Sequence, residues 1–261
     1  LDLYAIHFVL VARLNDAIEY GKRAAEIYRK VGDLWNWYTS LTQSVIPALG
    51  HLGQFQQSYD LCQSVVQMGQ EIGSLQAQEM GVGTQSGILR RLRRYAEADQ
   101  LSLKALDFDK VTGDAYMGSI FRAELARSYL AQGRLEQALP LLEEAKSIFA
   151  SHSTRGAAST YLHNALAETY LYAAETRGKA EFDQWMKAAK AACRETLKQG
   201  RFVHIGSAEG IRLQGTWDWL AGKRAAAVQY WQKSRSFAER TGQVYDMAQA
   251  LLEMGQRLGE Q

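Results

Sequence analysis

Apolar and small residues recur along this chain at the spacing of one helix face. Ala138, Leu142 and Ala145 stand at positions i, i+4 and i+7, which places all three on one side of an α-helix. The small residue that opens this pattern returns in steps of 41, 40, 40, 50 and 39 residues, at Ala17, Ser58, Ala98, Ala138, near Ala188 and at Ala227. A period of this length is typical of stacked helical repeats.

Glycines mark the expected turns between these helices. Gly53 and Gly133 each precede the small residue by five positions, where a tight turn favours a residue without Cβ. A second set of glycines comes directly after the amphipathic runs. Each is followed by a residue that can cap the next helix: the pairs are Gly32-Asp33, Gly73-Ser74 and Gly113-Asp114. In repeat four the turn after the second helix falls on residues 151–154, and the next glycine is Gly156. In the later repeats Gly200 and Gly242 resume the pattern.

We therefore expect an all-α fold, a right-handed superhelical solenoid of about six antiparallel helical hairpins with a period near 40. The chain has only two prolines, Pro47 and Pro140, so nothing except the periodic glycines interrupts long helices, and no segment alternates as a strand would. We treat residues 1–261 as a single array. The chain starts inside a helix at Leu1 and ends after an unpartnered helix, Tyr245 to Leu258, so we expect a piece of a longer protein.

Composition narrows the class of protein. The formal net charge is only +2, so a role in binding nucleic acid is disfavoured. No apolar run of about 18 residues and no signal segment occurs, so we expect no membrane span. Cys62 and Cys193 lie on separate helical patterns, which favours two reduced thiols and a cytoplasmic location.

One repeat resembles a known family. Its pattern places large, small and aromatic residues on the first helix and small residues on the second, as in Leu125, Ala126, Tyr129, Gly133, Leu135, Ala138, Leu142 and Ala145. This resembles the tetratricopeptide repeat. The usual repeat has 34 residues, so an interval near 40 implies helices about one turn longer or wider turns.

The closing stretch resembles a subgroup with longer repeats. Its residues are Arg212 to Lys223, then Ala227, Trp231, Glu239 to Gly242 and Leu252 to Gly255. They are similar to the C-terminal arms of multidomain signalling ATPases, such as regulators of the maltose-activator type and fusions with adenylate cyclases or kinases. The resemblance implies a sensor arm that binds a protein, peptide or small effector and restrains a nucleotide-hydrolysing switch.

The sequence gives little support for a catalytic site or a metal-binding site. Gly222-Lys223 is followed by Arg224, and the glycines from Gly81 to Gly87 have no lysine after them, so neither forms a phosphate-binding loop. The five histidines do not form an i, i+4 pair, and Glu143 and Glu144 are adjacent rather than facing. We expect no enzyme activity, no cofactor and no metal.

Arginine is concentrated in repeat three, at Arg90, Arg91, Arg93 and Arg94. Four guanidiniums so close together suit carboxylates or phosphates. Three interpretations stay open for this cluster: a solvated helix face, a contact with a protein or acidic ligand, and a contact with nucleic acid.

The inner wall of the array is the expected binding surface. In such solenoids the first helix of each repeat lines the concave face, and its mixture of arginine, amide and aromatic residues suits capture of a peptide. Carried over from the tetratricopeptide pattern, the candidate residues are Gln43, His51, Arg90, Arg91, Arg127, Tyr161, Asn164, Glu168 and Tyr172.

Repeat five breaks the period. Its first helix is expected to end near Tyr172, and the segment at residues 175–181 adds about ten residues before Trp185. This insertion marks either a contact face or a neutral change.

Two functions of different class remain. One is a sensor array that binds a partner, and the other is a structural scaffold that oligomerises through its repeat ends.

Overall fold

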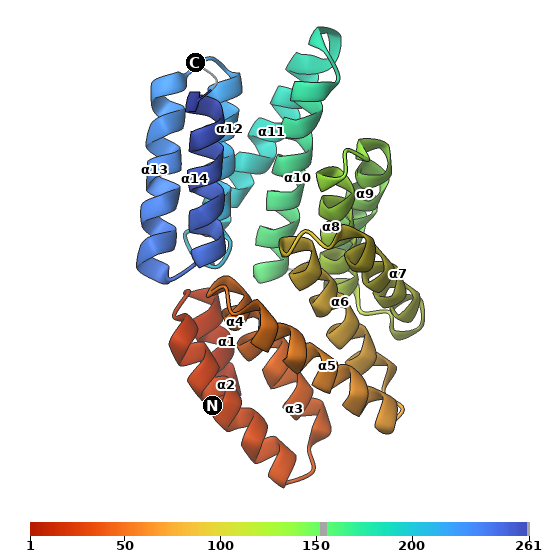
Figure 1. The fold of residues 1–261 in the computed structure, drawn as a ribbon. Coiled ribbons are helices and arrows are strands. Elements are labelled where there is room, and N and C mark those ends of the chain that lie inside the picture. Colours follow the sequence, from red (N-terminus) through yellow and green to blue (C-terminus); the bar gives the residue numbers. More distant parts are fainter. Residues whose placement is uncertain (152–155, 260–261) are drawn as a thin grey trace. The chain divides into compact units, whose positions relative to one another are not determined.

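Every regular element in the described part of the chain is a helix. The computed structural model describes residues 1–151 and 156–259, and Figure 1 labels its elements. They are α1 (Asp2–Leu10), α2 (Leu14–Lys30), α3 (Leu34–Ser40), the π-helical segment η1 (Leu41–Val45), α4 (Ile46–His51), α5 (Phe55–Glu71), α6 (Leu75–Arg91), α7 (Tyr95–Thr112), α8 (Ala115–Ala131), α9 (Leu135–Ser151), α10 (Ala157–Thr176), α11 (Lys179–Gln199), α12 (Ser207–Leu220), α13 (Arg224–Thr241) and α14 (Val244–Gly259).

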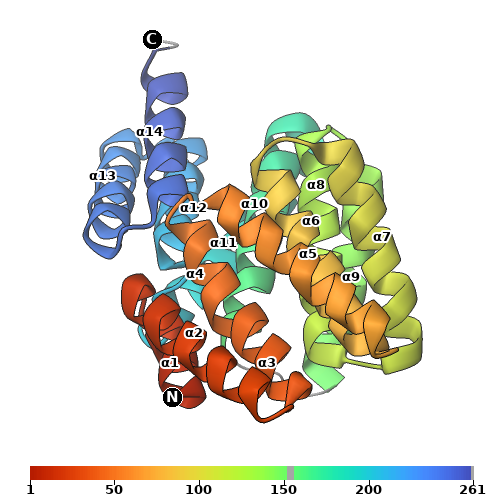
Figure 2. The same ribbon diagram turned by 60° about the horizontal axis from the view of Figure 1, so that its bottom comes forward.

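Successive helices pair into the six predicted hairpins, which confirms the helical-repeat solenoid. Repeat one pairs α1 with α2, repeat two pairs the continuous helix α3-η1-α4 with α5, and repeats three to six pair α6 with α7, α8 with α9, α10 with α11 and α12 with α13. Figure 2 shows the antiparallel course of these pairs from a second side. The helices group into two compact units, Leu1–Thr154 and Arg155–Gln261. The single array over residues 1–261 stays a prediction.

The small residues that set the period are packing positions. Each predicted residue is the fourth of the second helix of its repeat, and each is at most 1% exposed, at Ala17, Ser58, Ala98, Ala138 and Ala227. In repeat five the buried residue is Ala189 rather than Ala188, which is partly exposed. The recurrence therefore reports close approach between helices and carries no information about a ligand.

The turns between helices need left-handed backbone, as the glycines predict. Gly53 and Gly133 have φ values of +76° and +74°, a conformation that costs other residues free energy. In repeat three the equivalent turn is made by Arg93, whose φ is +60°. Gly200 does not resume the pattern, since its φ is −59° and Gly206 takes the left-handed position. Residues 152–154 lie outside the described part.

Repeat two contains a π-helical turn. The segments α3, η1 and α4 form one continuous helix of 18 residues, whereas α6 and α8 have 17 each. The extra residue accounts for the step of 41 between Ala17 and Ser58. At Gly21 of α2 a Cβ atom would lie 2.3 Å from Ser44 Oγ, so this glycine makes room for the widened turn.

Much of the extra length of repeat five lies in its helices, which together exceed α8 and α9 by seven residues. The first helix, α10, continues past Tyr172 to Thr176, and α11 starts at Lys179, so only Arg177 and Gly178 form the turn. The two helices have 20 and 21 residues. The insertion therefore does not form a separate loop.

The last helix is packed on its own unit. The sequence predicts an unpartnered helix from Tyr245 to Leu258, and α14 instead packs against α13 and α12. Glu253 of α14 accepts a hydrogen bond from Thr216 Oγ1 of α12 at 3.1 Å, and its carboxylate lies 3.2 Å from Arg212 Nη1. Arg257 Nη1 pairs with Glu175 Oε1 of α10 at 2.5 Å. These contacts fix one face of α14.

Candidate binding surface

Three predicted arginines gather around one carboxylate in the first unit. Arg90 and Arg91 end α6, and Arg127 lies on the neighbouring helix α8. Arg90 Nε donates to Glu124 Oε2 of α8 at 2.6 Å, and this pair is nearly buried. The carboxylate lies against Gly87 of α6, where a Cβ would be 3.4 Å from Glu124 Oε2. We name Arg90, Arg91, Arg127 and Glu124 the arginine cluster.

The electrostatics of the arginine cluster are dominated by its cations. Burial alone would raise the pKa of Glu124, but the guanidiniums of Arg90 and Arg127, and to a smaller extent that of Arg91, lower this pKa to about 2. Glu124 is therefore ionised at neutral pH.

Sequence reasoning missed Glu124, although a signal for it was present. Glu124 lies three residues before Arg127 on α8, and residues at i and i+3 share a helix face. Once Arg127 is assigned to the inner wall, Glu124 follows on the same face. The long-range contact with Arg90, 34 positions earlier, needs the packing of α6 on α8 and could not be read from spacing.

The other two predicted residues of the first unit, His51 and Gln43, lie in repeat two and differ in exposure. Arg91 Nη1 lies 3.2 Å from the position of a Cβ on Gly50, next to His51 at the end of α4. His51 is buried, whereas Gln43 in η1 is exposed. The run of four arginines is also divided. Arg93 and Arg94 are exposed, and Arg94 Nη2 pairs with Glu97 Oε2 at 2.5 Å along α7.

In the second unit, Asn164 fastens two helices. It is completely buried, and its Nδ2 donates to Gly206 O and to Glu209 Oε2, each at 3.0 Å. The contacts tie α10 to the start of α12, so this amide group stabilises the repeat instead of standing on an open wall. Tyr161, Glu168 and Tyr172 of α10 are partly exposed.

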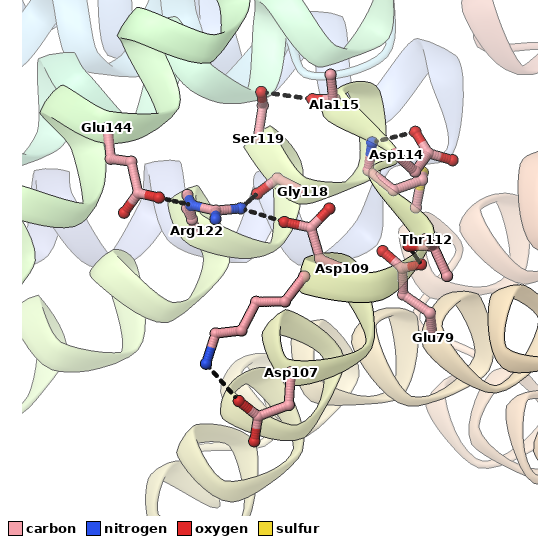
Figure 3. A network of polar contacts seen from close by, with 12 residues as sticks. Glu79, Asp107, Asp109, Thr112, Asp114, Ala115, Gly118, Ser119, Arg122 and Glu144 are labelled. Atoms are coloured by element: carbon pink, nitrogen blue, oxygen red, sulfur yellow. Dashed lines mark hydrogen bonds and ion pairs between the residues drawn. The ribbon is translucent and has the colours of Figure 1, made fainter.

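A second polar network joins repeats three and four (Figure 3). Thr112 Oγ1 donates to Glu79 Oε2 at 2.5 Å, and Arg122 Nη1 donates to Asp109 Oδ2 at 2.7 Å. Arg122 also pairs with Glu144 at 2.8 Å. Burial raises the pKa of Glu79 to about 7, against the hydrogen bond from Thr112. This network holds α6, α7, α8 and α9 together, and Glu144, whose side chain is about half exposed, is one end of it.

The residues considered for catalysis have structural roles. Gly83 lies inside α6, where a Cβ would meet the ring of Phe121 at 2.2 Å, and Gly222 makes a turn with φ of +78°. Both cysteines are buried thiols. Within residues 1–151 and 156–259, no group of three or more His, Cys, Asp or Glu side chains could hold a metal ion. In the same ranges no helix has the length and apolar character needed to cross a membrane.

Most tryptophans of the last third belong to the core or its edge. Trp231 is fully buried, and Trp217 Nε1 donates to Met186 O at 3.0 Å. Trp185 Nε1 donates to Glu181 along α11. These side chains connect neighbouring helices and do not form an aromatic ligand site.

Comparison with known proteins supports a tetratricopeptide-repeat array. The family model described as "Tetratricopeptide repeat" matches residues 122–149, in α8 and α9. Among curated proteins, none matches this chain. The apo form of RapI has a similar structure, with a TM-score of 0.65 and 13% identity over 90% of this chain and 80% of that one. BtubC from P. vanneervenii has a TM-score of 0.57 and 15% identity over 87% and 91% of the two chains. These likenesses show the fold.

Proposed function

We propose that this chain is a protein-interaction scaffold that captures an acidic segment of its partner at the arginine cluster. The observation that carries the proposal is the grouping of Arg90, Arg91 and Arg127 around one ionised carboxylate, Glu124. The repeat fold supports protein binding as the general role.

The chemistry of the cluster suits a carboxylate ligand. A guanidinium presents five N–H donors in a planar fork that matches the two oxygens of a carboxylate. Glu124 holds Arg90 in place through a 2.6 Å hydrogen bond. An acidic side chain of a partner would add a second carboxylate to a site whose cations are already ordered. Binding would therefore cost little side-chain entropy.

The finer role is that of a regulatory arm. The resemblance of residues 210–260 to the sensor arms of signalling ATPases supports a chain that couples partner or effector binding to a nucleotide-hydrolysing switch. Two buried free thiols, Cys62 and Cys193, fit a reducing compartment such as the cytoplasm. A phosphate-binding loop encoded in frame before Leu1 would support this role, and further repeats there would contradict it.

The acidic-segment proposal is tested by fluorescence anisotropy. The probe is a short fluorescein-labelled peptide of alternating glutamate and serine, compared with the same peptide carrying lysine in place of glutamate. We expect saturable binding of the acidic peptide alone. Added salt should weaken it, because Arg91 is partly exposed and its charge is screened, whereas Arg90 and Arg127 are buried.

A matched pair of arginine variants locates the site. Arg91→Gln should weaken binding of the acidic peptide by about tenfold or more, because one charge-assisted hydrogen bond contributes about 1.5–3 kcal/mol. Arg94→Gln removes a charge three residues away that pairs with Glu97 outside the cluster, so it should bind as the wild type does. Equal losses in both variants, or no binding of the acidic peptide, would refute the proposed site.

A further inference from the structure

Positive charge is concentrated in one stretch of the second unit. Between Lys187 and Arg240 the chain has 11 lysine and arginine residues against four aspartate and glutamate residues. The formal net charge of this stretch is therefore +7, and the rest of the chain carries −5. Two of the four carboxylates, on Glu209 and Asp218, are buried. The whole-chain charge of +2, which disfavours nucleic acid, averages over two parts of opposite charge.

On α11 the cations form one exposed row. They stand at positions i, i+3, i+7 and i+11, which share a helix face, and the row is about 16 Å long. Its members, which we name the α11 row, are Lys187, Lys190, Arg194 and Lys198, all exposed. The turn after the helix adds Arg201 and Phe202, and Phe202 is 76% exposed. Among the described residues, only Glu195 lies within ion-pair distance of this row, 3.5 Å from Lys198 Nζ.

On α13, aromatic and cationic side chains alternate along one face. We name Tyr230, Lys233, Phe237 and Arg240, at positions i, i+3, i+7 and i+10, the α13 row. Lys233 Nζ lies 6.0 Å from the centre of the Tyr230 ring, and Arg240 Cζ lies 5.9 Å from the centre of the Phe237 ring. Both cations are exposed and both rings are partly exposed. Each ring therefore has a cation next to it.

Two aromatic contacts place the α11 row and the α13 row on one surface. Near the start of α13, Lys190 and Lys223 lie over the same Trp217 ring, with their Nζ atoms 5.3 and 5.1 Å from its centre. Near the end of α13, the Phe237 ring meets His204, in the turn after α11, edge to face at 6.0 Å. We name the two rows, together with Arg201, Phe202 and Lys223, the basic face.

We propose that the basic face binds single-stranded nucleic acid. Exposed lysine and arginine side chains attract the phosphates of the strand, and aromatic rings beside them give the bases surfaces on which to stack. The basic face is separate from the arginine cluster, which lies in the first unit.

The aromatic residues favour a strand with bases over other polyanions. An acidic protein segment would use the cations of the basic face and would leave its rings without a role. Insertion into a membrane surface needs an apolar face, whereas among residues 187–240 only Phe202 is a large exposed apolar side chain.

Fluorescence anisotropy with labelled strands tests the proposal. The probes are oligo(dT) and oligo(U) of about 12 nucleotides, and an abasic DNA strand of the same length. The wild-type chain should bind a base-containing strand, and the tighter of the two identifies DNA or RNA as the source. The logarithm of the binding constant should fall against the logarithm of the salt concentration with a slope of about −0.7 for each phosphate contacted. The abasic strand keeps the charge but has no bases, so it should bind about fivefold or more weakly.

Two double variants locate the phosphate contacts. Lys187→Gln with Arg194→Gln removes two cations of the α11 row, so the salt dependence should become shallower by about 1.4. Lys22→Gln with Arg29→Gln removes one exposed lysine and one exposed arginine from α2 in the first unit, so it should bind as the wild type does. Since all four side chains are exposed, circular dichroism should show the same helix content in both variants.

Phe202→Ala tests the stacking. This variant should bind the base-containing strand about fivefold or more weakly and should bind the abasic strand as the wild type does. Three results would overturn the proposal: no binding of either base-containing strand, an abasic strand that binds as tightly as they do, or equal losses in the two double variants. Binding to vesicles that contain phosphatidylserine, without binding to the strands, would assign the basic face to a membrane surface instead.

Discussion

Replacing Glu79 by glutamine should stabilise the first unit at neutral and alkaline pH. The side chain of Glu79 is completely buried, and its Oε1 accepts no hydrogen bond from any described residue. Asp109 and Asp114 raise its pKa further, after burial, while Thr112 and Arg122 act in the opposite direction. Glutamine keeps the acceptor for the Thr112 hydroxyl, has nearly the same shape and removes the charge.

The magnitude follows from the shift in the pKa. In the unfolded chain Glu79 has its ordinary pKa of 4.5, and in the folded chain the value is about 7. Below pH 4.5 both states are protonated and burial of this group has no electrostatic cost. Between pH 4.5 and 7 the folded state binds more protons, so stability falls as the pH rises. Each pKa unit corresponds to about 1.36 kcal/mol, which gives an upper limit of about 3 kcal/mol above pH 7.

Thermal unfolding of wild type and Glu79→Gln, followed by circular dichroism from pH 4 to pH 8, measures this effect. The two Tm values should coincide near pH 4 and separate steadily, with the variant several degrees higher at pH 8. Glu97→Gln is the control with the opposite sign, because its hydrogen bond with Arg94 lowers the pKa of Glu97. Parallel Tm curves for wild type and Glu79→Gln across this range would refute the argument.

Three further substitutions test the packing. Ala138→Arg should destabilise the first unit by about 3 kcal/mol or more, because it overfills a fully buried position and buries a charge; urea unfolding within about 0.5 kcal/mol of wild type would contradict the assigned hairpin. Arg93→Gly should raise the unfolding free energy by up to about 1 kcal/mol, because left-handed backbone strains arginine more than the added chain entropy of glycine costs; a lower unfolding free energy would count against this. Glu124→Ala should cost about 3 kcal/mol, since it leaves Arg90 without its buried carboxylate, and a change below about 1 kcal/mol would show that the pair is dispensable.

The repeat architecture could be predicted because its signals are local. The positions of Ala17, Ser58 and Ala138 report close helix packing, and the glycines report left-handed turns, and both signals lie within one hairpin. The prediction of the buried position was wrong by one residue in repeat five, where Ala189 and not Ala188 is buried. There the longer helices shift the phase of the pattern, and a count of residues from the turn no longer locates the contact.

The candidate site was harder to predict because its contacts are long-range. The sequence grouped Arg90 with Arg93 and Arg94 by proximity, whereas the fold groups Arg90 with Glu124 and Arg127 across two helices. Asn164 shows the same difficulty. Its place on the first helix of a repeat suggests the inner wall, and only the path of the chain at Gly206 explains why its amide is buried.

The π-helical turn in repeat two has a consequence for the history of the chain. A single added codon in the middle of a helix would normally rotate every later side chain by about 100°, but the widened turn at Leu41–Val45 absorbs the extra residue. Ser58 of the following helix consequently keeps its buried place. A gap aligning repeat two with its neighbours belongs inside this helix and not in a turn, and deletion of one residue from this segment should yield a repeat with the common spacing of 40.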